Sequence, residues 1–276
     1  MGTTTIMAII KPPFEIVGSI RGVSFYKQYG SDKIIMRTKG GATKQKIKNS
    51  PKFAQLRLHQ TEWGGCVKMS RAICSAMWRV IPLADFNVSA NMNGFAKKLQ
   101  ALDTEMSVGE RRILLSKNKY LLDGFQLNRI HTFASILRIA PFWEIKRETL
   151  EARVEIPYIN TDIHLVNPNN LPFFRIVVSL GCASDMVREE AGRKEYLPMN
   201  GNINGFVNSK CTEWFSTNRQ IQAQELIINY DEQYIPKLTD DISMILSIGV
   251  EFGKQGFNNQ PVEVKRAGCA KVLGVK

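Results

Sequence analysis

The chain has 276 residues, of which 44% are hydrophobic and 22% are charged, a balance typical of globular proteins with a sizeable buried core. Its net charge of +12 is concentrated in one half: residues 1–130 hold 21 Lys and Arg against eight Asp and Glu, while the remainder holds 16 against 17. This asymmetry predicts an acidic partner for the basic half. No apolar run is long enough to span a bilayer, so we expect no membrane insertion.

Two β-rich runs at residues 16–38 flank a Gly30-Ser31-Asp32 turn and predict a β-hairpin. We assign residues 1–48 to an N-terminal β-hairpin arm. A lone hairpin is only marginally stable in water, so the arm is expected to pack on another surface. The apolar run before it lacks a preceding positive charge and is followed by two prolines, which is unlike a signal peptide, and the default compartment is cytoplasmic.

Four residues are candidates for the packing of this arm. Gly18 and Gly22 interrupt the first run, where they indicate β-bulges or the close approach of another backbone. Phe25 and Tyr26 lie in the same run and are expected to pack across the strands, or to stack on bases if the partner is nucleic acid.

A long helix is predicted to start at Ser50 and Pro51 and to run to about Val80. Gly64 and Gly65 in its middle lower the helix propensity, which suggests close packing against a neighbour or a kink. The spacing of three and four residues predicts one buried stripe that comprises Phe53, Leu56, Gln60, Trp63, Val67, Ser70, Cys74 and Met77.

Two further helices are predicted before residue 125. The first covers residues 89–106 and repeats the same apolar spacing. The second covers residues 107–124, where Ser107 and Glu110 form a capping box and Gly124 gives a stop signal. Residues 49–124 are therefore expected to form a small helical bundle segment.

Beyond Gly124 the hydrophobic period changes from 3.6 towards 2, and polar turns separate short runs. Strands without alternating helices predict an antiparallel β-sandwich over residues 125–276, and the fold class is therefore α+β. The candidate strands are residues 125–128, 133–139, 152–159, 173–180, 205–209, 213–215, 223–230, 243–252, 261–265 and 270–275.

The basic segment is the sharpest feature, because residues 33–79 hold eleven basic residues and one acid, Glu62. Gly40-Gly41 within it lacks the G-x-x-x-x-G-K-[ST] pattern, so it predicts a turn and not a phosphate cradle. The segment indicates an electrostatic contact with a partner, and the candidate contact residues are Lys33, Arg37, Lys39, Lys44, Lys46, Lys48, Lys52 and Arg57.

Residues for catalysis or metal binding are sparse. The three histidines, His59, His131 and His164, have no H-x-x-x-H or H-E-x-x-H spacing and accompany no G-x-S-x-G elbow. The five cysteines are widely spread and contain no C-x-x-C pair, which predicts free thiols and neither a disulfide framework nor a zinc site. We therefore expect no catalytic residue, no metal and no cofactor, in a protein that is not an enzyme.

The stretch GSIRGVSFYKQYGSDKIIMRTKGG followed by NSPKFAQLR resembles the opening of a group of uncharacterised bacterial proteins. In that group a glycine-punctuated hairpin, an R-x-x-G-G turn and an Asn-x-x-x-F-x-x-x-R helix start precede helices and a β-rich C-terminal region. The resemblance covers about the first sixty residues, and Trp63-Gly64-Gly65 departs from its pattern. It implies this architecture and a non-enzymatic role, and the matching positions are Gly18, Gly22, Phe25, Arg37, Gly40, Gly41, Asn49, Phe53 and Arg57.

We therefore expect a structural or interaction protein that is a subunit of a larger bacterial or phage-like assembly, such as a filament, a shell or a secretion-related complex. Its partners would be other protein chains, including copies of itself, because a basic and a slightly acidic half can meet head to tail. One alternative is nucleic-acid binding through residues 33–79. A second is a glycan-binding β-sandwich, which would need Trp143 or Trp214 exposed beside carboxylates.

Overall fold

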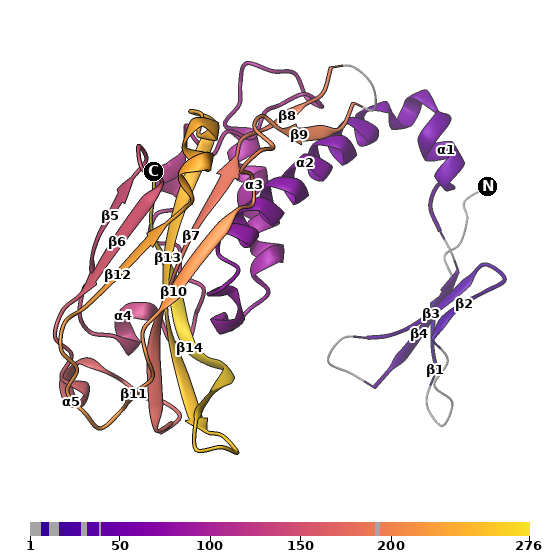
Figure 1. The fold of residues 1–276 in the computed structure, drawn as a ribbon. Coiled ribbons are helices and arrows are strands. Elements are labelled where there is room, and N and C mark those ends of the chain that lie inside the picture. Colours follow the sequence, from indigo (N-terminus) through magenta and orange to yellow (C-terminus); the bar gives the residue numbers. More distant parts are fainter. Residues whose placement is uncertain (1–6, 11–16, 29–31, 39, 191–193) are drawn as a thin grey trace. The chain divides into compact units, whose positions relative to one another are not determined.

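The computed structural model describes residues 7–10, 17–28, 32–38, 40–190 and 194–276 (Figure 1). The chain divides into two compact units, an N-terminal unit, Met1–Arg57, and a C-terminal unit, Leu58–Lys276. The expected mixture of helices and antiparallel strands is confirmed, with one antiparallel sheet near the N-terminus and others towards the C-terminus. Gly30 and Ser31 of the predicted turn lie outside the described residues.

The N-terminal unit contains an antiparallel sheet in the order β1-β4-β3-β2. Arg21 and Gly22 form the turn between β2 and β3, with φ angles of 43° and 86°, as a two-residue type I′ turn requires. Gly22 is therefore a turn residue and not a bulge, and the unit has one more hairpin than we predicted. The strands are β1 (Met7–Ile10), β2 (Gly18–Ile20), β3 (Val23–Lys27) and β4 (Ile34–Thr38).

Three helical elements follow the sheet: α1 (Lys44–Asn49), the 3-10 turn η1 (Pro51–Phe53) and α2 (Ala54–Ala76). Thr43 caps α1, because its hydroxyl accepts the backbone N–H of Lys46 at 3.2 Å. The predicted start at Ser50 and Pro51 coincides with η1.

The C-terminal unit is built around a five-stranded sheet in the order β10-β7-β13-β14, with β11 paired to β7. Its strands are β7 (Phe173–Ser184), β10 (Val207–Cys211), β11 (Phe215–Ser216), β13 (Ile242–Gln255) and β14 (Pro261–Val275). Both faces of β7 and β13 are covered, which explains why these strands read as almost continuous apolar runs. In Figure 1 the helices α2 and α3 (Val88–Ala101) lie along one face of this sheet.

A three-stranded sheet in the order β12-β6-β5 lies on the opposite side of the five-stranded sheet (Figure 1). Its inward side chains, such as Ala152, Val154 and Ile228, share one hydrophobic cluster with Ile176 and Val178 of β7. A second cluster joins α2 and α3 to the other face of β7 and β13. The three strands are β5 (Phe142–Lys146), β6 (Glu151–Ile156) and β12 (Gln224–Asn229).

The remaining elements are short. The hairpin of β8 (Met186–Arg188) and β9 (Tyr196–Pro198) forms a sheet of its own. The other helical elements are η2 (Ile81–Leu83), η3 (Lys119–Leu121), α4 (Phe133–Ile136), α5 (Thr161–His164) and η4 (Glu232–Lys237). The predicted strand at residues 133–139 is therefore wrong, because its first four residues form α4.

The predicted third helix at residues 107–124 is also wrong, because this segment consists of turns around η3. Partners distant in sequence accept backbone N–H groups of this segment. Gly109 donates to Glu62 at 2.8 Å, Ser116 donates to Asp185 at 2.9 Å, and Ile113 donates to the carbonyl of Met186 at 2.9 Å.

The buried face of α2 differs from the predicted stripe. Trp63 belongs to that stripe but is 47% exposed, and Val67 and Cys74 are only half-buried. Small residues face the sheet because the helix approaches it closely: a Cβ atom on Gly181 of β7 would lie 2.2 Å from the Cα atom of Ala76. The buried residues are Glu62, Gly65, Cys66, Met69, Ser70, Ala72, Ile73 and Ala76.

The two adjacent glycines of α2 have opposite surroundings. A Cβ atom on Gly65 would lie 2.5 Å from the buried ring of Tyr196, whereas no described atom lies within 4 Å of that position at Gly64. The Tyr196 ring is fixed at its far end, because its hydroxyl donates to the carbonyl of Arg111 at 2.7 Å. The close packing therefore involves Gly65 and not Gly64.

This contrast predicts opposite effects of two neighbouring substitutions. Gly65→Ala should lower the free energy of unfolding by about 1–3 kcal/mol through overpacking against Tyr196. Gly64→Ala should raise it by up to about 1 kcal/mol, because alanine has the higher helix propensity. Urea unfolding of both variants checks this, and equal effects would contradict the described packing of α2.

Candidate interaction surfaces

The N-terminal unit carries most of the positive charge of the chain. Residues 1–57 hold 11 Lys and Arg against two Asp and Glu, a net charge of +9 out of +12. Lys44, Lys46 and Lys48 are exposed on α1, and Lys52 is exposed on η1. None of these four lysines forms an ion pair with another described residue, so their charge faces solvent.

The other predicted contact residues lie on different elements. Lys33 precedes β4 and Arg37 lies on it, both exposed, while Lys39 lies outside the described residues. Arg57 is half-buried and donates from Nη1 to the carbonyls of Ile47 at 2.7 Å and Ser50 at 2.9 Å. It therefore satisfies carbonyl groups at the end of α1, a structural use of its charge that sequence reasoning missed.

The four residues predicted to pack the arm have unequal surroundings. Phe25 is half-buried directly opposite Met36, a cross-strand pair, whereas Tyr26 is 39% exposed. Gly18 and Gly22 are exposed, and no described atom lies within 4 Å of where their Cβ atoms would be. Among the described residues these glycines therefore serve backbone conformation and not the close approach of another backbone.

An acidic surface lies on the outward face of the three-stranded sheet. Alternate residues of β5, β6 and β12 point outward, and they include Glu144, Glu151, Glu155 and Glu225 with two cations, Lys146 and Arg153. Lys146 lies 3.9 Å from Glu144 and 3.7 Å from Glu151. We call these six charged residues the acidic face, and four carboxylates against two cations give it a net negative charge.

Two carboxylates of the acidic face lie directly opposite each other, Glu155 on β6 and Glu225 on β12. Like charges in this position repel and destabilise a strand pair. Arg153 is their common partner, at 3.0 Å from Glu155 and in close contact with Glu225. One cation therefore serves two carboxylates, and a further cation from outside would lower the electrostatic energy of this pair.

A shallow hollow of about 310 Å³ opens at this carboxylate pair. Its polar lining comprises Glu155, Glu225, Arg153 and Gln224. Its apolar lining comprises Phe142, Ile156, Pro157 and Ala223, and Phe142 is 70% exposed. The hollow thus joins carboxylates to an apolar floor.

Sequence reasoning predicted strands at residues 152–159 and 223–230 but missed the acidic face, because it predicted neither β5 nor the pairing that places Glu155 opposite Glu225. The signal was nonetheless present, since EARVEI alternates charged and apolar residues with period 2, as does QELIIN in part. The charged positions of such a strand point to one side, so this alternation predicts a charged outward face.

Two buried carboxylates of the C-terminal unit, Glu62 and Glu251, have the opposite balance of charge, because each binds two cationic side chains. Glu62 is fully buried and accepts from Arg111 at 2.7 and 2.8 Å, from Lys97 at 3.0 Å and from the N–H of Gly109 at 2.8 Å. Burial raises the pKa of Glu62, but the hydrogen bonds from Arg111, Gly109 and Lys97 outweigh it and lower the pKa to about 2. This cluster fastens α2 and α3 to the segment that follows them.

Glu251 on β13 forms a second buried cluster. It accepts from Arg79 at 2.5 and 3.0 Å and from Arg175 at 2.6 Å. The Arg175 guanidinium lies 4.3 Å from the ring centre of Trp214, and that ring packs on Gly253. Trp143 likewise packs on Gly274. Trp214 is thus half-buried and engaged by Arg175, whereas Trp143 remains 43% exposed, so only Trp143 meets the exposure that the glycan-binding alternative requires.

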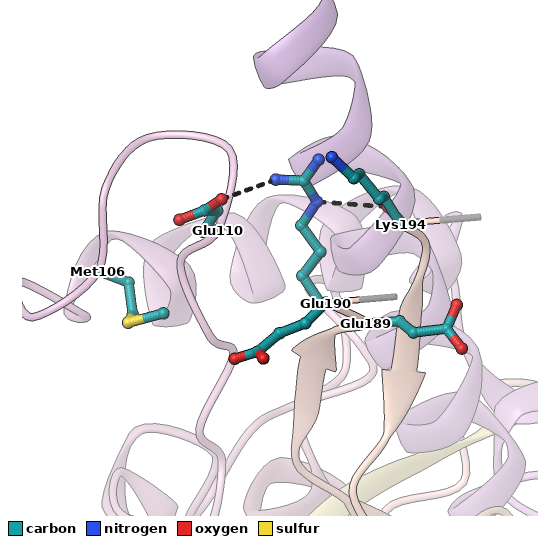
Figure 2. Close-up of a pocket in the computed structure, with 6 residues that line it drawn as sticks. Met106, Glu110, Glu189, Glu190 and Lys194 are labelled. Atoms are coloured by element: carbon teal, nitrogen blue, oxygen red, sulfur yellow. Dashed lines mark hydrogen bonds and ion pairs between the residues drawn. The ribbon is translucent and has the colours of Figure 1, made fainter. Parts of the chain in front are cut away.

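A further pocket of about 230 Å³ lies beside the β8–β9 hairpin and is drawn in Figure 2. Arg188 donates to Glu110 at 3.2 Å and to the carbonyl of Lys194 at 3.3 Å, so its charge is already engaged. Residues 191–193, between Glu190 and Lys194 in the sequence, lie outside the described residues.

Catalytic and metal-binding groupings do not emerge from the described residues. His131 is exposed, His164 accepts the N–H of Asn160 at 3.1 Å, and His59 lies 3.7 Å from Glu62. No cluster of three His, Cys, Asp or Glu side chains with the geometry of a metal site occurs in this part of the chain. Burial raises the pKa of the Cys66 and Cys182 thiols to about 11, which disfavours the reactive thiolate.

Comparison with known proteins gives no assignment, since no family model, curated protein or solved structure matches the chain. In the described part of the chain, no helix combines the length and the apolar character needed to cross a membrane.

The Glu62 cluster generates a stability prediction. Glu62→Gln should lower the free energy of unfolding by about 3–5 kcal/mol at neutral pH, because it leaves Arg111 and Lys97 without their carboxylate. The exposed Glu263→Gln is the control and should cost less than about 1 kcal/mol. Urea unfolding measures both, and equal costs would contradict the structural role of Glu62.

The same cluster predicts a pH dependence. The folded pKa of Glu62 lies below its ordinary value of 4.5, so its contribution to stability is complete above that pH and is lost as the pH falls towards about 2. Asp103 acts in the same direction, because Arg112 lowers its pKa from 3.8 to about 2. The free energy of unfolding should therefore decrease below about pH 4.5, and less steeply in Glu62→Gln.

Proposed function

We propose that this chain is a non-enzymatic structural or interaction protein, a subunit of a larger bacterial or phage-like assembly such as a filament, a shell or a secretion-related complex. In this proposal the two packed sheets of the C-terminal unit act as a β-sandwich scaffold. The N-terminal unit makes the electrostatic contact with an acidic partner.

The observation that carries the proposal is the concentration of charge. A net charge of +9 lies within residues 1–57, and the α1 lysines have no ion-pair partner among the described residues. Such a surface attracts acidic partners and loses this attraction as salt screens it. The N-terminal sheet also supports an interaction role, because most of its described side chains are half-buried or exposed. Such incomplete burial is typical of a surface that binds a partner.

Nucleic-acid binding is the second candidate, and Tyr26 is the observation that favours it. This side chain is 39% exposed in the same basic unit and would offer a stacking face to a base. Binding to an oligonucleotide should then weaken steeply with salt, with a slope of about −0.9 per phosphate contact on logarithmic axes for duplex DNA. A flat salt response would remove this candidate.

Assembly is tested by light scattering and electron microscopy of the purified protein. We expect particles larger than a monomer at about 0.1 M salt, and dissociation towards about 1 M, where the Debye length falls from about 10 Å to about 3 Å. A protein that stays monomeric across concentration and salt, and that retains no partner, would contradict the proposal.

Charge reversal on α1 is the matched test of the contact. Lys44→Glu, Lys46→Glu and Lys48→Glu together should abolish assembly while leaving the fold intact, because these side chains are exposed. The control reverses Lys210, Lys254 and Lys265, three exposed lysines of the C-terminal unit, and should assemble normally. Equal loss in both variants would indicate that only net charge matters.

A further inference from the structure

The acidic face offers a binding site for a long cationic side chain. At the Glu155–Glu225 pair one arginine is shared by two carboxylates that lie directly opposite each other. The hollow beside this pair has an apolar floor with Phe142 and Pro157. A lysine side chain complements this hollow, because its apolar stem can pack on the floor while its ammonium group pairs with the carboxylates. Phe142 adds an exposed aromatic face that attracts a cation.

The chain itself carries a ligand of this kind on α1. Lys44 and Lys48 are four residues apart and therefore lie on the same side of the helix, about 6 Å apart along its axis. Glu155 and Glu225 lie on adjacent strands, whose spacing is about 4.8 Å. Two lysines of one helix face can thus meet the two carboxylates together, and the signs of the charges are complementary.

We propose that α1 of one copy docks on the acidic face of a second copy, with an α1 lysine in the hollow at Glu155 and Glu225. The inference rests on the proposed function and adds the identity of the partner surface. The two surfaces are unlike, so a copy that donates α1 keeps its own acidic face free for the next copy. Such a contact forms a ring if the rotation between copies closes it and a filament if it does not.

The test uses two full-length variants. The helix variant carries Lys44→Glu, Lys46→Glu and Lys48→Glu. The face variant carries Glu144→Lys, Arg153→Glu, Glu155→Lys and Glu225→Lys. It inverts every charge at the hollow, and it includes Glu144 because that residue lies directly opposite Arg153 on β5, so that position 153 still faces opposite charges. Circular dichroism and thermal unfolding verify that each variant is folded. A milder face variant, Glu155→Gln with Glu225→Gln, replaces the inverted one if that variant does not fold.

Sedimentation velocity measures association of each variant alone and of an equimolar mixture. Alone, each should require at least about a tenfold higher concentration to associate than the unaltered chain, a change equivalent to about 1.4 kcal/mol. The mixture of the helix variant with the inverted face variant should regain association, because each now offers the charge that the other lacks. With the milder face variant the mixture should form pairs, since only one of its two contacts is complementary.

The outcomes separate this inference from the function it rests on. If the unaltered chain associates and only the helix variant fails, the acidic partner is another surface and the inference is overturned while the assembly function stands. If the variants fail alone and the mixture does not regain association, docking between these two surfaces of different copies is also overturned. If the unaltered chain stays monomeric at all salt concentrations, the assembly function fails together with the inference.

Discussion

The close approach of α2 to the five-stranded sheet is the constraint on which the C-terminal unit depends. Gly181 and Ala76 meet with no room for another carbon atom, and Ser179 donates to the carbonyl of Ala76 at 3.1 Å. Because small residues occupy this contact, α2 covers one face of β7 and β13 and the three-stranded sheet covers the other. The helix side of the sheet is thereby closed, and the acidic face lies on the outward side of the second sheet. The same constraint turns Trp63 and Trp78 towards solvent, since the narrow contact has no space for them.

Two interior carboxylates and the acidic face have opposite ratios of cations to carboxylates. Glu62 and Glu251 each bind two cationic side chains. On the acidic face each cation is shared by two carboxylates, as Arg153 shows. Residues 58–276 are nearly balanced in total, with 26 Lys and Arg against 23 Asp and Glu, yet arginines held in the interior clusters contribute little to the outer surface. The negative surface therefore arises from the placement of charges and not from composition.

Much of the fold follows from the sequence, and the failures have identifiable causes. The long strands β7 and β13 and the helices α2 and α3 were predicted because their hydrophobic period extends over many residues. The helix at residues 107–124 failed because Glu62 and Asp185, distant in sequence, accept its N–H groups. The rotation of the buried face of α2 could not be read from hydrophobicity, since it depends on how small the facing strand residues are. The basic half of the candidate contact was visible as a run, but the acidic half required the register that places Glu155 opposite Glu225.

The scarcity of carboxylates in residues 1–57 also bears on how the N-terminal unit holds together. Eleven cations and two anions repel one another within a unit in which Ile34 is buried and most other described residues are not. Dissolved anions that gather around the unit reduce this repulsion, and so does any acidic surface that binds it. Its folding equilibrium is thus linked to occupancy, since whatever binds the folded form stabilises it by mass action. The unit is therefore least stable alone in dilute buffer. Its sheet should become more stable when an acidic surface binds α1.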